Sequence, residues 1–331
     1  MTAGVLAPAV LRAAKPGSAA RVAVIGAGVF GAWTVEHLRR AGHAVNLIDM
    51  AGPANNRASS GGESRMTRAG YGRDAIYSKM AFDSLKEWKA LSTSSGLPIF
   101  IPHGVLFFTA TPDDYFTQSL AVNRSLGLPI AEMNQSQMQR RFPMIDFSGV
   151  ALGMFEPDFG ALLARRAVQT LVKRYTEAGG LYQQTAARPP SAAGDRLLSL
   201  QTLNGARIEA DIFVFACGPW LSKLFPKLLG GRIIATRQEV FFFAPPAGEP
   251  MFQPGWMPGW ADFNGGDVYY GFPDLEGRGV KFAHDAHGVE VDPDPIPPAD
   301  QGRTGRDHRL PRSPLSEAEE RSTHRSARLP I

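Results

Sequence analysis

The chain contains 331 residues, of which 44% are hydrophobic and 20% charged, a composition typical of a globular protein that can bury a large core. Its net charge of +4 is small for this length and its basic residues are scattered, so the sequence does not favour a nucleic-acid partner. The one cysteine, Cys217, excludes an internal disulfide and argues against a cysteine-based metal site, and we expect no bound metal. No apolar run is long enough to span a membrane, so we expect no membrane partner.

Residues 1–20 are rich in alanine and loosely apolar, but they lack the basic start and the long apolar core of a signal peptide. We predict a disordered leader here, and a degraded export signal is the alternative. A single cysteine fits a reducing compartment, and we expect a cytoplasmic protein. The length of the chain leads us to expect two domains.

Residues 21–50 contain a complete strand–turn–helix–strand pattern. The apolar run over 22–25 predicts a buried strand, and Gly26, Gly28 and Gly31 follow it with the spacing G-x-G-x-x-G. A helical pattern comes next, with Glu36 on its polar side, and a second apolar run over 45–48 ends on Asp49. This order of elements is typical of a dinucleotide-binding unit.

Each part of that unit has a physical role. Gly26 allows the tight turn, Gly28 lets a pyrophosphate approach the backbone, and Gly31 lets the helix pack close to the sheet. The helix N-terminus offers unpaired N–H groups to the phosphates, and the Asp49 carboxylate can accept hydrogen bonds from a ribose. A glycine-rich turn before an ordinary helix is the alternative reading. The unit alone does not distinguish FAD from NAD.

The rest of the chain alternates between helical and strand-like patterns. Helices are predicted over 76–91, 113–127, 135–141, 161–178 and 221–229. Strands are predicted over 99–101 and 105–108 as a hairpin, over 207–215 and 233–243, and over 268–272 and 279–284 as a pair. We therefore predict an α/β fold in which a Rossmann-like domain is interleaved with an antiparallel-sheet (α+β) substrate domain. Residues 293–331 are rich in proline and arginine without any period, and we predict that they are disordered.

Several blocks of sequence, in this order, resemble the FAD-dependent amine and amino-acid oxidases of the D-amino-acid-oxidase-like superfamily. The similarity is greatest to the group of monomeric sarcosine oxidase and N-methyltryptophan oxidase, and it covers Arg21 to Asp292. The blocks are VIGAGVFGAW…LIDM, SGGESRMTRAGYG, HGVLFF, MFEPDFGAL, FACGPWLSKL, TRQEVFFF and DVYYGFPDLEGRGVKFAHDAHG. One such block would be weak support, whereas the ordered set is specific.

The resemblance implies an FAD cofactor and oxidation of the C–N bond of a secondary amine or amino acid. Hydride would pass to flavin N5, and reoxidation by oxygen would give hydrogen peroxide. The resemblance also implies an FAD-binding domain over 21–92 and 147–230, a substrate domain over 93–146 and 231–292, and a monomer that takes a small substrate.

The positions that match the family's cofactor residues fall into three segments of the chain. They are Gly26, Ala27, Gly28, Phe30, Gly31 and Asp49 in the dinucleotide unit, Ser59, Gly62, Ser64 and Arg65 in the following loop, and Gly218 and Trp220 further on. The resemblance implies that Arg65 lies close to the isoalloxazine, where a fixed positive charge would stabilise reduced flavin.

Four residues match positions of the family's catalytic site. By resemblance Arg65 lies beside the flavin, Arg68 grips the substrate carboxylate, Tyr270 lines the substrate pocket, and Lys281 activates oxygen near flavin N5. From their patterns alone, Arg65 and Arg68 are equally consistent with surface arginines, Lys281 with a solvated edge lysine, and Tyr270 with a core residue.

The sequence also departs from the family. Gly61 and Asp285 stand where some members have a histidine, and the family's region after the Lys281 block is not recognisable beyond Asp292. We expect that the end of the chain reflects a truncation or a change of reading frame. Two alternative functions follow, namely an inactive remnant that binds FAD weakly or not at all, and an NAD(P)-dependent dehydrogenase that shares only the dinucleotide unit.

Overall fold

The computed structural model describes residues 19–190, 196–263 and 268–294, which form two compact units. One unit contains the residues up to Ser60 together with Val168–Ile233, and the other contains Gly61–Ala167 together with the residues from Ile234 onward. The predicted leader and the predicted disordered tail lie almost entirely outside the described residues.

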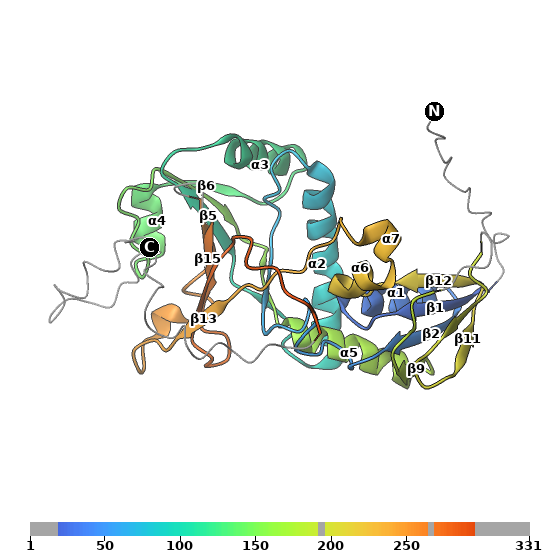
Figure 1. The fold of residues 1–331 in the computed structure, drawn as a ribbon. Coiled ribbons are helices and arrows are strands. Elements are labelled where there is room, and N and C mark those ends of the chain that lie inside the picture. The colour runs from blue at the N-terminus through green and yellow to red at the C-terminus, as the bar shows by residue number, and fades with distance from the viewer. Residues whose placement is uncertain (1–18, 191–195, 264–267, 295–331) are drawn as a thin grey trace, which may run out of the picture. The chain divides into compact units, whose positions relative to one another are not determined.

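A parallel sheet forms the centre of the first unit, shown in blue and yellow in Figure 1. Its strands are β1 (Arg21–Ile25), β2 (Ala44–Asp49), β9 (Leu181–Gln184) and β12 (Ile212–Phe215), in the order β12-β1-β2-β9. Every neighbouring pair is parallel, with Val24 opposite both Leu47 and Val214. Parallel strands need a crossover between them, and α1 (Val29–Arg40) supplies it from β1 to β2. This arrangement confirms the predicted strand–helix–strand unit.

The polar side predicted for α1 is wrong at Glu36, whose side chain is fully buried. Its carboxylate forms ion pairs with Arg39 at 3.2 Å, with Arg40 at 2.9 Å, and with Arg174 of α5 (Ala164–Glu177) at 3.5 Å. Burial would raise the pKa of Glu36, but the hydrogen bonds from the two arginines of α1 outweigh it and hold the pKa below its usual value. Pairing of this kind is what allows a carboxylate to be buried.

The parallel sheet packs against a small hairpin of β10 (Ser199–Gln201) and β11 (Arg207–Glu209). Ala23, Ile25 and Ile48 of the sheet form a core with Leu200, Ile208 and Ala210, and Cys217 packs against this core. The strand predicted over 207–215 is thus two strands, β11 and β12. The helix predicted over 221–229 is divided into α6 (Leu221–Leu224) and α7 (Pro226–Leu229), because Pro226 has no N–H to continue a helix.

The second unit contains a seven-stranded sheet and a three-stranded sheet. The large sheet has the order β13-β16-β15-β14-β5-β7-β6 and is antiparallel except between β14 and β5. Its strands are β5 (Val105–Thr109), β6 (Ala131–Asn134), β7 (Leu152–Glu156), β13 (Val240–Phe243), β14 (Gly259–Asp262), β15 (Tyr269–Phe272) and β16 (Val280–His284). The small sheet has the order β3-β8-β4, formed by β3 (Arg65–Thr67), β8 (Gly160–Leu162) and β4 (Phe100–Pro102).

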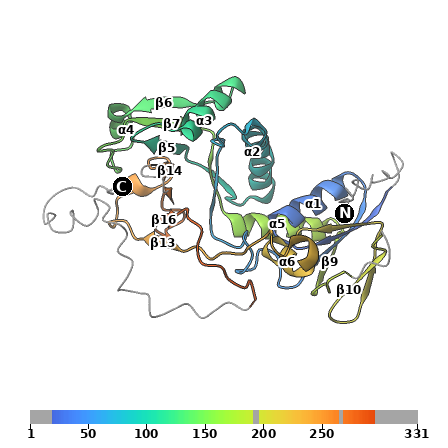
Figure 2. The same cartoon turned by 45° about the horizontal axis from the view of Figure 1, so that its top comes forward.

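The helices of the second unit are α2 (Ala75–Ser95), α3 (Asp114–Ser125) and α4 (Gln135–Arg141), with a short 3-10 turn η2 (Pro250–Phe252). Figure 2 shows α3 and α4 beside the strands β5, β6 and β7. A capping box starts α4, since Asn134 and Gln137 each bond the other's backbone N–H. The main core packs Phe108 and Trp260 of the large sheet with Phe147. Mixed parallel and antiparallel sheets confirm the predicted α/β class.

Three predicted elements of the second unit are wrong. The strands predicted as a hairpin over 99–108 belong to different sheets, because β4 pairs with β8 whereas β5 pairs with β7 and β14. The strand predicted over 233–243 forms only at 240–243, and the helix predicted from residue 161 starts at 164 after β8. In each case the partner strand is distant in sequence, and local periodicity does not detect it.

The compact units also differ in extent from the predicted domains. The unit boundaries fall after residues 60, 167 and 233, whereas we predicted boundaries after residues 92, 146 and 230. The difference arises because β7 and β8 pair with strands of the second unit. The assignment of one domain to FAD and the other to substrate stays a prediction.

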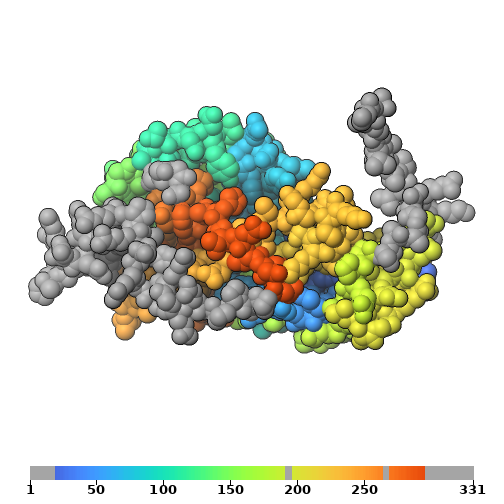
Figure 3. Space-filling view, in the orientation of Figure 1, coloured from blue at the N-terminus to red at the C-terminus, as the bar shows by residue number. Residues whose placement is uncertain are grey.

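The surface of the described residues is coloured in Figure 3, where the segment after β16 is red-orange and lies on the visible face. In this segment Asp285 and His287 are exposed, as is Val289. Within residues 19–190, 196–263 and 268–294, no helix is long and apolar enough to cross a membrane.

Candidate active site

The three motif glycines meet different constraints in the first unit. Gly26 has a φ of +106°, and a Cβ on it would lie 2.4 Å from the carbonyl oxygen of Ala216. A Cβ on Gly31 would lie 1.7 Å from the carbonyl oxygen of Gly26, so neither position tolerates a side chain. At Gly28 the one described atom within 4 Å of such a Cβ, outside its chain neighbours, is the Ser60 hydroxyl at 3.1 Å.

Gly28 therefore passes a simple test of fit to a dinucleotide. Packing of the protein itself explains why Gly26 and Gly31 lack a side chain, but it leaves the space beside Gly28 largely open. Gly28 is also the N-cap of α1, where it offers no side chain, and the first turn of the helix contains no acidic residue. The positive end of the helix is thus available to a phosphate group, as a pyrophosphate site requires.

The Asp49 carboxylate lies at the end of β2, where the sequence predicted it. One of its oxygens accepts the N–H of Ala27 at 2.8 Å, and the other accepts the N–H groups of Ala51 and Gly52, each at 2.8 Å. A carboxylate has about four lone-pair positions, so Asp49 keeps capacity for a ribose hydroxyl. Its three backbone contacts also fix the two loops that surround it.

Ser60 contributes to this site, although it is not among the residues predicted from the sequence. Its hydroxyl oxygen accepts the N–H of Val29, the first residue of α1, at 3.0 Å. Ser59, the neighbour that we predicted from the family pattern, also belongs to this loop. A serine pair shortly after the acidic strand end was the available signal, since hydroxyl groups commonly satisfy the first N–H groups of helices.

The other predicted cofactor residues of the first unit occupy varied environments. Ala27 is fully buried, whereas the side chain of Phe30 is 81% exposed. Gly218 has a φ of +51° and starts the turn η1 (Gly218–Trp220), with two residues between it and the end of β12. The Arg57 guanidinium lies 6.0 Å from the ring centroid of Trp220. Contact of these residues with FAD stays a prediction.

The open space at Gly28 yields a testable prediction. Gly28→Val is expected to weaken FAD binding by about tenfold or more, because the added methyl groups occupy the approach of the pyrophosphate. The unfolding temperature of the apoprotein is expected to fall modestly, since an added Cβ would lie 3.1 Å from the Ser60 hydroxyl and has no other described neighbour outside its own stretch of chain. Gly231→Val is the control, because nothing described lies within 4 Å of a Cβ there. Equal FAD affinities in a fluorescence titration of the two variants would contradict the role of Gly28.

In the second unit, Lys281 is the centre of a polar cluster on β16. The side chain is only 3% exposed, and its Nζ donates to the carbonyl oxygen of Ser64 at 3.3 Å and to the Ser64 hydroxyl at 3.4 Å. The same Nζ lies 4.7 Å from the ring centroid of Phe272 and 5.9 Å from that of Tyr270. Lys281 is therefore not the solvated edge lysine that its strand pattern alone allows.

Two cationic side chains converge on one oxygen atom in this cluster. Arg65 Nη1 donates to the carbonyl oxygen of Ser64 at 2.9 Å, and this is the oxygen that Lys281 also contacts. Burial lowers the pKa of Lys281 to about 8, and the charge of Arg65 adds to the effect. The cluster thus concentrates positive charge, which favours a neighbouring group that gains negative charge.

Tyr270 completes the same face of the sheet. It precedes Phe272 by two residues on β15, and Phe272 pairs directly with Lys281 across the strands. Residues two apart on a strand point to the same side, so the three side chains share one face. Burial raises the pKa of the Tyr270 hydroxyl, against the effect of Arg65. The structure therefore brings Arg65, Tyr270 and Lys281 together, and their roles at the flavin and the substrate stay predictions.

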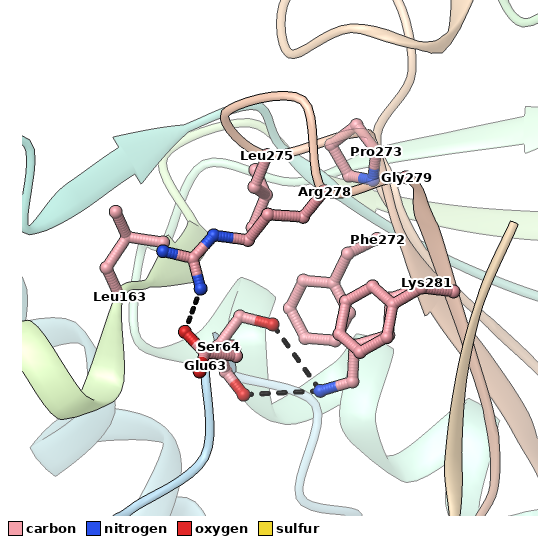
Figure 4. A pocket seen from close by; sticks show the side chains of 10 residues that line it. Glu63, Ser64, Leu163, Phe272, Pro273, Leu275, Arg278, Gly279 and Lys281 are labelled. Carbon is pink, nitrogen blue, oxygen red and sulfur yellow. Dashed lines mark hydrogen bonds and ion pairs between the residues drawn. The ribbon is translucent and has the colours of Figure 1, made fainter. Parts of the chain in front are cut away.

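A small pocket adjoins Lys281, and Figure 4 shows Lys281 directed at Ser64 and Arg278 directed at Glu63. Its solvent-accessible volume of about 10 Å³ is close to the space of one water molecule. The residues that line it are Glu63, Ser64, Leu163, Phe242, Phe272, Pro273, Leu275, Arg278, Gly279 and Lys281.

The loop that carries Gly62, Ser64 and Arg65 is fixed by residues that the sequence analysis did not predict. Glu63 forms ion pairs with Arg278 and, at 3.6 Å, with Arg165. The Arg165 side chain also donates to the carbonyl oxygen of Gly61 at 2.7 Å. These contacts hold the Ser64 carbonyl in place for the two cations. Arg165 lies more than a hundred positions from the loop, and its pattern carries no local signal.

Arg68 has a different set of neighbours. Its Nη1 donates to the carbonyl oxygen of Gly70 and, at 3.2 Å, to the hydroxyl of Tyr115. Its guanidinium lies 4.1 Å from the ring centroid of Tyr71, in a cation–π contact. The structure thus gives Arg68 an ordered setting, while none of these contacts involves Arg65, Tyr270 or Lys281. Its predicted role in binding a carboxylate is not tested by this geometry.

Comparison with known proteins identifies relatives along most of the chain. Residues 21–313 match the model of the DAO family, described as FAD dependent oxidoreductase, and this match extends beyond Asp292. Monomeric sarcosine oxidase from Bacillus sp. (strain B-0618) is 28% identical over 283 residues, which is 83% of this chain and 70% of that protein. N-methyl-L-tryptophan oxidase from Yersinia pestis (strain Pestoides F) is 28% identical over 209 residues, which is 62% of this chain and 55% of that protein.

Solved structures share the fold. NikD, an unusual amino acid oxidase essential for nikkomycin biosynthesis, aligns with a TM-score of 0.63 at 22% identity and covers 82% of this chain and 70% of its own. A modified fructosyl peptide oxidase from Aspergillus nidulans aligns with a TM-score of 0.68 at 21% identity. This alignment covers 82% of this chain and 65% of the fructosyl peptide oxidase chain.

The family match covers most of the chain, and the glycine motif, the α1 N-terminus and Asp49 fit the adenosine diphosphate half of FAD. The finding supports FAD and disfavours the NAD(P)-dependent alternative. The chain therefore belongs to the FAD dependent oxidoreductase (DAO) family, as its sequence pattern predicted, and FAD is its cofactor.

Proposed function

We propose that this chain oxidises the C–N bond of a secondary amine or amino acid, and its similarity to a protein named monomeric sarcosine oxidase supports this proposal. When bound, FAD would accept the two electrons of the substrate, and oxygen would take them up with two protons to give hydrogen peroxide. The substrate loses a hydride from the carbon beside nitrogen and a proton from nitrogen, and water hydrolyses the resulting imine. The convergence of Arg65 and Lys281 on the Ser64 carbonyl is the observation that carries the proposal.

Within this proposal, the protein supplies charge and orientation. The positive charges of Arg65 and Lys281 would stabilise negative charge that develops on a neighbouring cofactor or on oxygen. Tyr270 lines the space beside them. Arg68 binds the carboxylate of an amino-acid substrate, because a guanidinium offers two parallel N–H donors to a carboxylate. Gly26, Gly28, Gly31 and Asp49 hold the adenosine diphosphate part of FAD.

Peroxide release from a panel of amines tests this function. The panel contains sarcosine, other N-methyl amino acids, a cyclic imino acid, a glycated amino acid and a methylated amine without a carboxylate. We expect peroxide from at least one member that has a carboxylate, and less from the amine that lacks one. Reduction of bound FAD by none of them would contradict the proposal and support an inactive remnant. The expected monomer and cytoplasmic location stay predictions, which light scattering and cell fractionation address.

A further inference from the structure

The loop from Arg68 to Gly72 is held by side chains rather than by a sheet or helix. It follows β3 and precedes α2, and four of its backbone groups bond to side chains of other elements. Ser78 of α2 donates to the Ala69 carbonyl at 2.7 Å, and Tyr115 of α3 donates to the Gly70 carbonyl at 2.7 Å. Ser119 of α3 accepts the Gly72 N–H at 2.7 Å, and Glu156 of β7 accepts the Ala69 N–H at 2.8 Å.

Glu156 is the charged member of this set, and it is almost fully buried at 1% exposure. One carboxyl oxygen accepts the Ala69 N–H, and the other accepts the side-chain N–H of Asn123 at 3.0 Å. Asn123 is also fully buried, and its side-chain oxygen has no hydrogen-bond partner among the described residues. Burial raises the pKa of Glu156 to about 7, against the Ala69 N–H and the charge of Arg68. Burying a carboxyl group costs free energy, so packing in the core does not by itself explain why a glutamate stands at this position.

Glu156 contacts Ala69, the residue next to Arg68. The Arg68 side chain in turn bonds within the same loop. Arg68 donates to the Gly70 carbonyl and to the Tyr115 hydroxyl, the same two groups that bond each other. A shift of the Ala69 amide would therefore move the guanidinium. The Arg68 charge also lies close enough to lower the pKa of Glu156. Glu156 thus acts on Arg68 through the backbone of Ala69.

We propose that Glu156, held by Asn123, is a positioning residue that fixes the loop of Arg68 and thereby orients its guanidinium for the carboxylate of an amino-acid substrate. This inference rests on the proposed role of Arg68. It adds a residue that the sequence did not single out as part of the site. Glu156 does not touch the substrate in this account.

Substitutions of Glu156 distinguish a role in orienting Arg68 from a general role in stabilising the fold. Glu156→Leu removes both hydrogen bonds and is expected to raise the KM for N-methyl amino acids by about tenfold, with kcat little changed. Amines without a carboxylate are expected to keep their KM. Glu156→Gln is expected to stay close to wild type, because its amide oxygen can accept from Ala69, and its NH2 can donate to the Asn123 side-chain oxygen once the Asn123 amide rotates by 180°. Thr109→Val is the matched control, since it removes the hydrogen bond of another buried polar residue in the same unit.

A binding measurement gives a result that does not need turnover. Propionate has a carboxylate but no C–N bond, so it binds without reacting. Calorimetry is expected to show about tenfold weaker propionate binding to Glu156→Leu than to wild type or Thr109→Val. Asn123→Ala removes the side-chain partner of Glu156 and is a smaller change. It is also expected to weaken the binding of propionate.

The outcomes distinguish this inference from the proposed function. If the wild type releases peroxide from an N-methyl amino acid but Glu156→Leu and Asn123→Ala bind propionate like the control, the inference is overturned and the function stands. If no amine reduces the flavin while propionate binding falls in both variants, the function is overturned and the positioning role stands. Equal losses for substrates with and without a carboxylate would also overturn the inference, because they indicate a general structural role.

Discussion

Replacing Lys281 with methionine is expected to slow the reaction of the reduced enzyme with oxygen by about a hundredfold, while reduction by substrate changes far less. Methionine has a similar length but no charge, so it removes the buried ammonium that contacts Ser64. Stopped-flow absorbance separates the two half-reactions, since substrate reduces the flavin without oxygen and oxygen is mixed in afterwards. Equal rates of reoxidation in the variant and the wild type would remove Lys281 from this role.

The pKa of Lys281 adds a pH dependence to the same experiment. Because burial lowers this pKa to about 8, the charged form decreases above that pH, and reoxidation by the wild type is expected to slow. Lys281→Met is expected to show no such slope. Between pH 8 and the usual lysine value of 10.5 the unfolded chain binds the extra proton, so this group makes stability rise with pH in the wild type.

Arg68→Ala is expected to raise the KM for carboxylate-bearing amines by about a hundredfold, and to leave amines without a carboxylate close to wild type. The change removes a guanidinium that the loop holds against Tyr71 and the Tyr115 hydroxyl. Arg73→Ala is the matched control, because Arg73 follows in the same segment and is exposed. Steady-state peroxide assays with both substrate classes measure the effect. Equal losses for the two classes would exclude Arg68 as the carboxylate-binding residue.

The dinucleotide unit could be predicted from sequence because its signals are local. The buried strand, the glycine spacing, the helix and Asp49 all lie within thirty residues, and the structure places each of them as predicted. Gly28 shows the value of the motif most clearly, since a Cβ there would meet one side-chain atom, the Ser60 hydroxyl oxygen at 3.1 Å, whereas backbone atoms exclude a Cβ at Gly26 and Gly31.

Residues that depend on distant partners could not be predicted. Glu36 has the pattern of a solvent-facing residue, yet its burial depends partly on Arg174, 138 positions away. The pattern around Pro102 suggests a hairpin, but β4 and β5 each find a partner remote in sequence. Glu156 likewise accepts a hydrogen bond from the N–H of Ala69, which is 87 positions away in the sequence. Local periodicity describes the propensity of a segment, whereas pairing and burial depend on the whole chain.

In the candidate active site, too, some residues could be predicted from the sequence and others could not. Lys281 and Arg65 were predicted by resemblance, and the structure adds that both reach one carbonyl oxygen of Ser64. The supports of that oxygen, Glu63 and Arg165, were not predicted. Glu63 and Arg165 are far apart in the sequence, and their contact forms only in the folded second unit, where the start of α5 lies beside the loop at 61–64.

The absorption spectrum of the purified protein, recorded without oxygen before and after addition of an N-methyl amino acid, tests the central claim most directly. The account predicts visible flavin bands that bleach when the amino acid is added and return when oxygen is admitted, with release of peroxide. Bands that stay unchanged with every member of the substrate panel, or a protein that remains colourless after incubation with FAD, would contradict it.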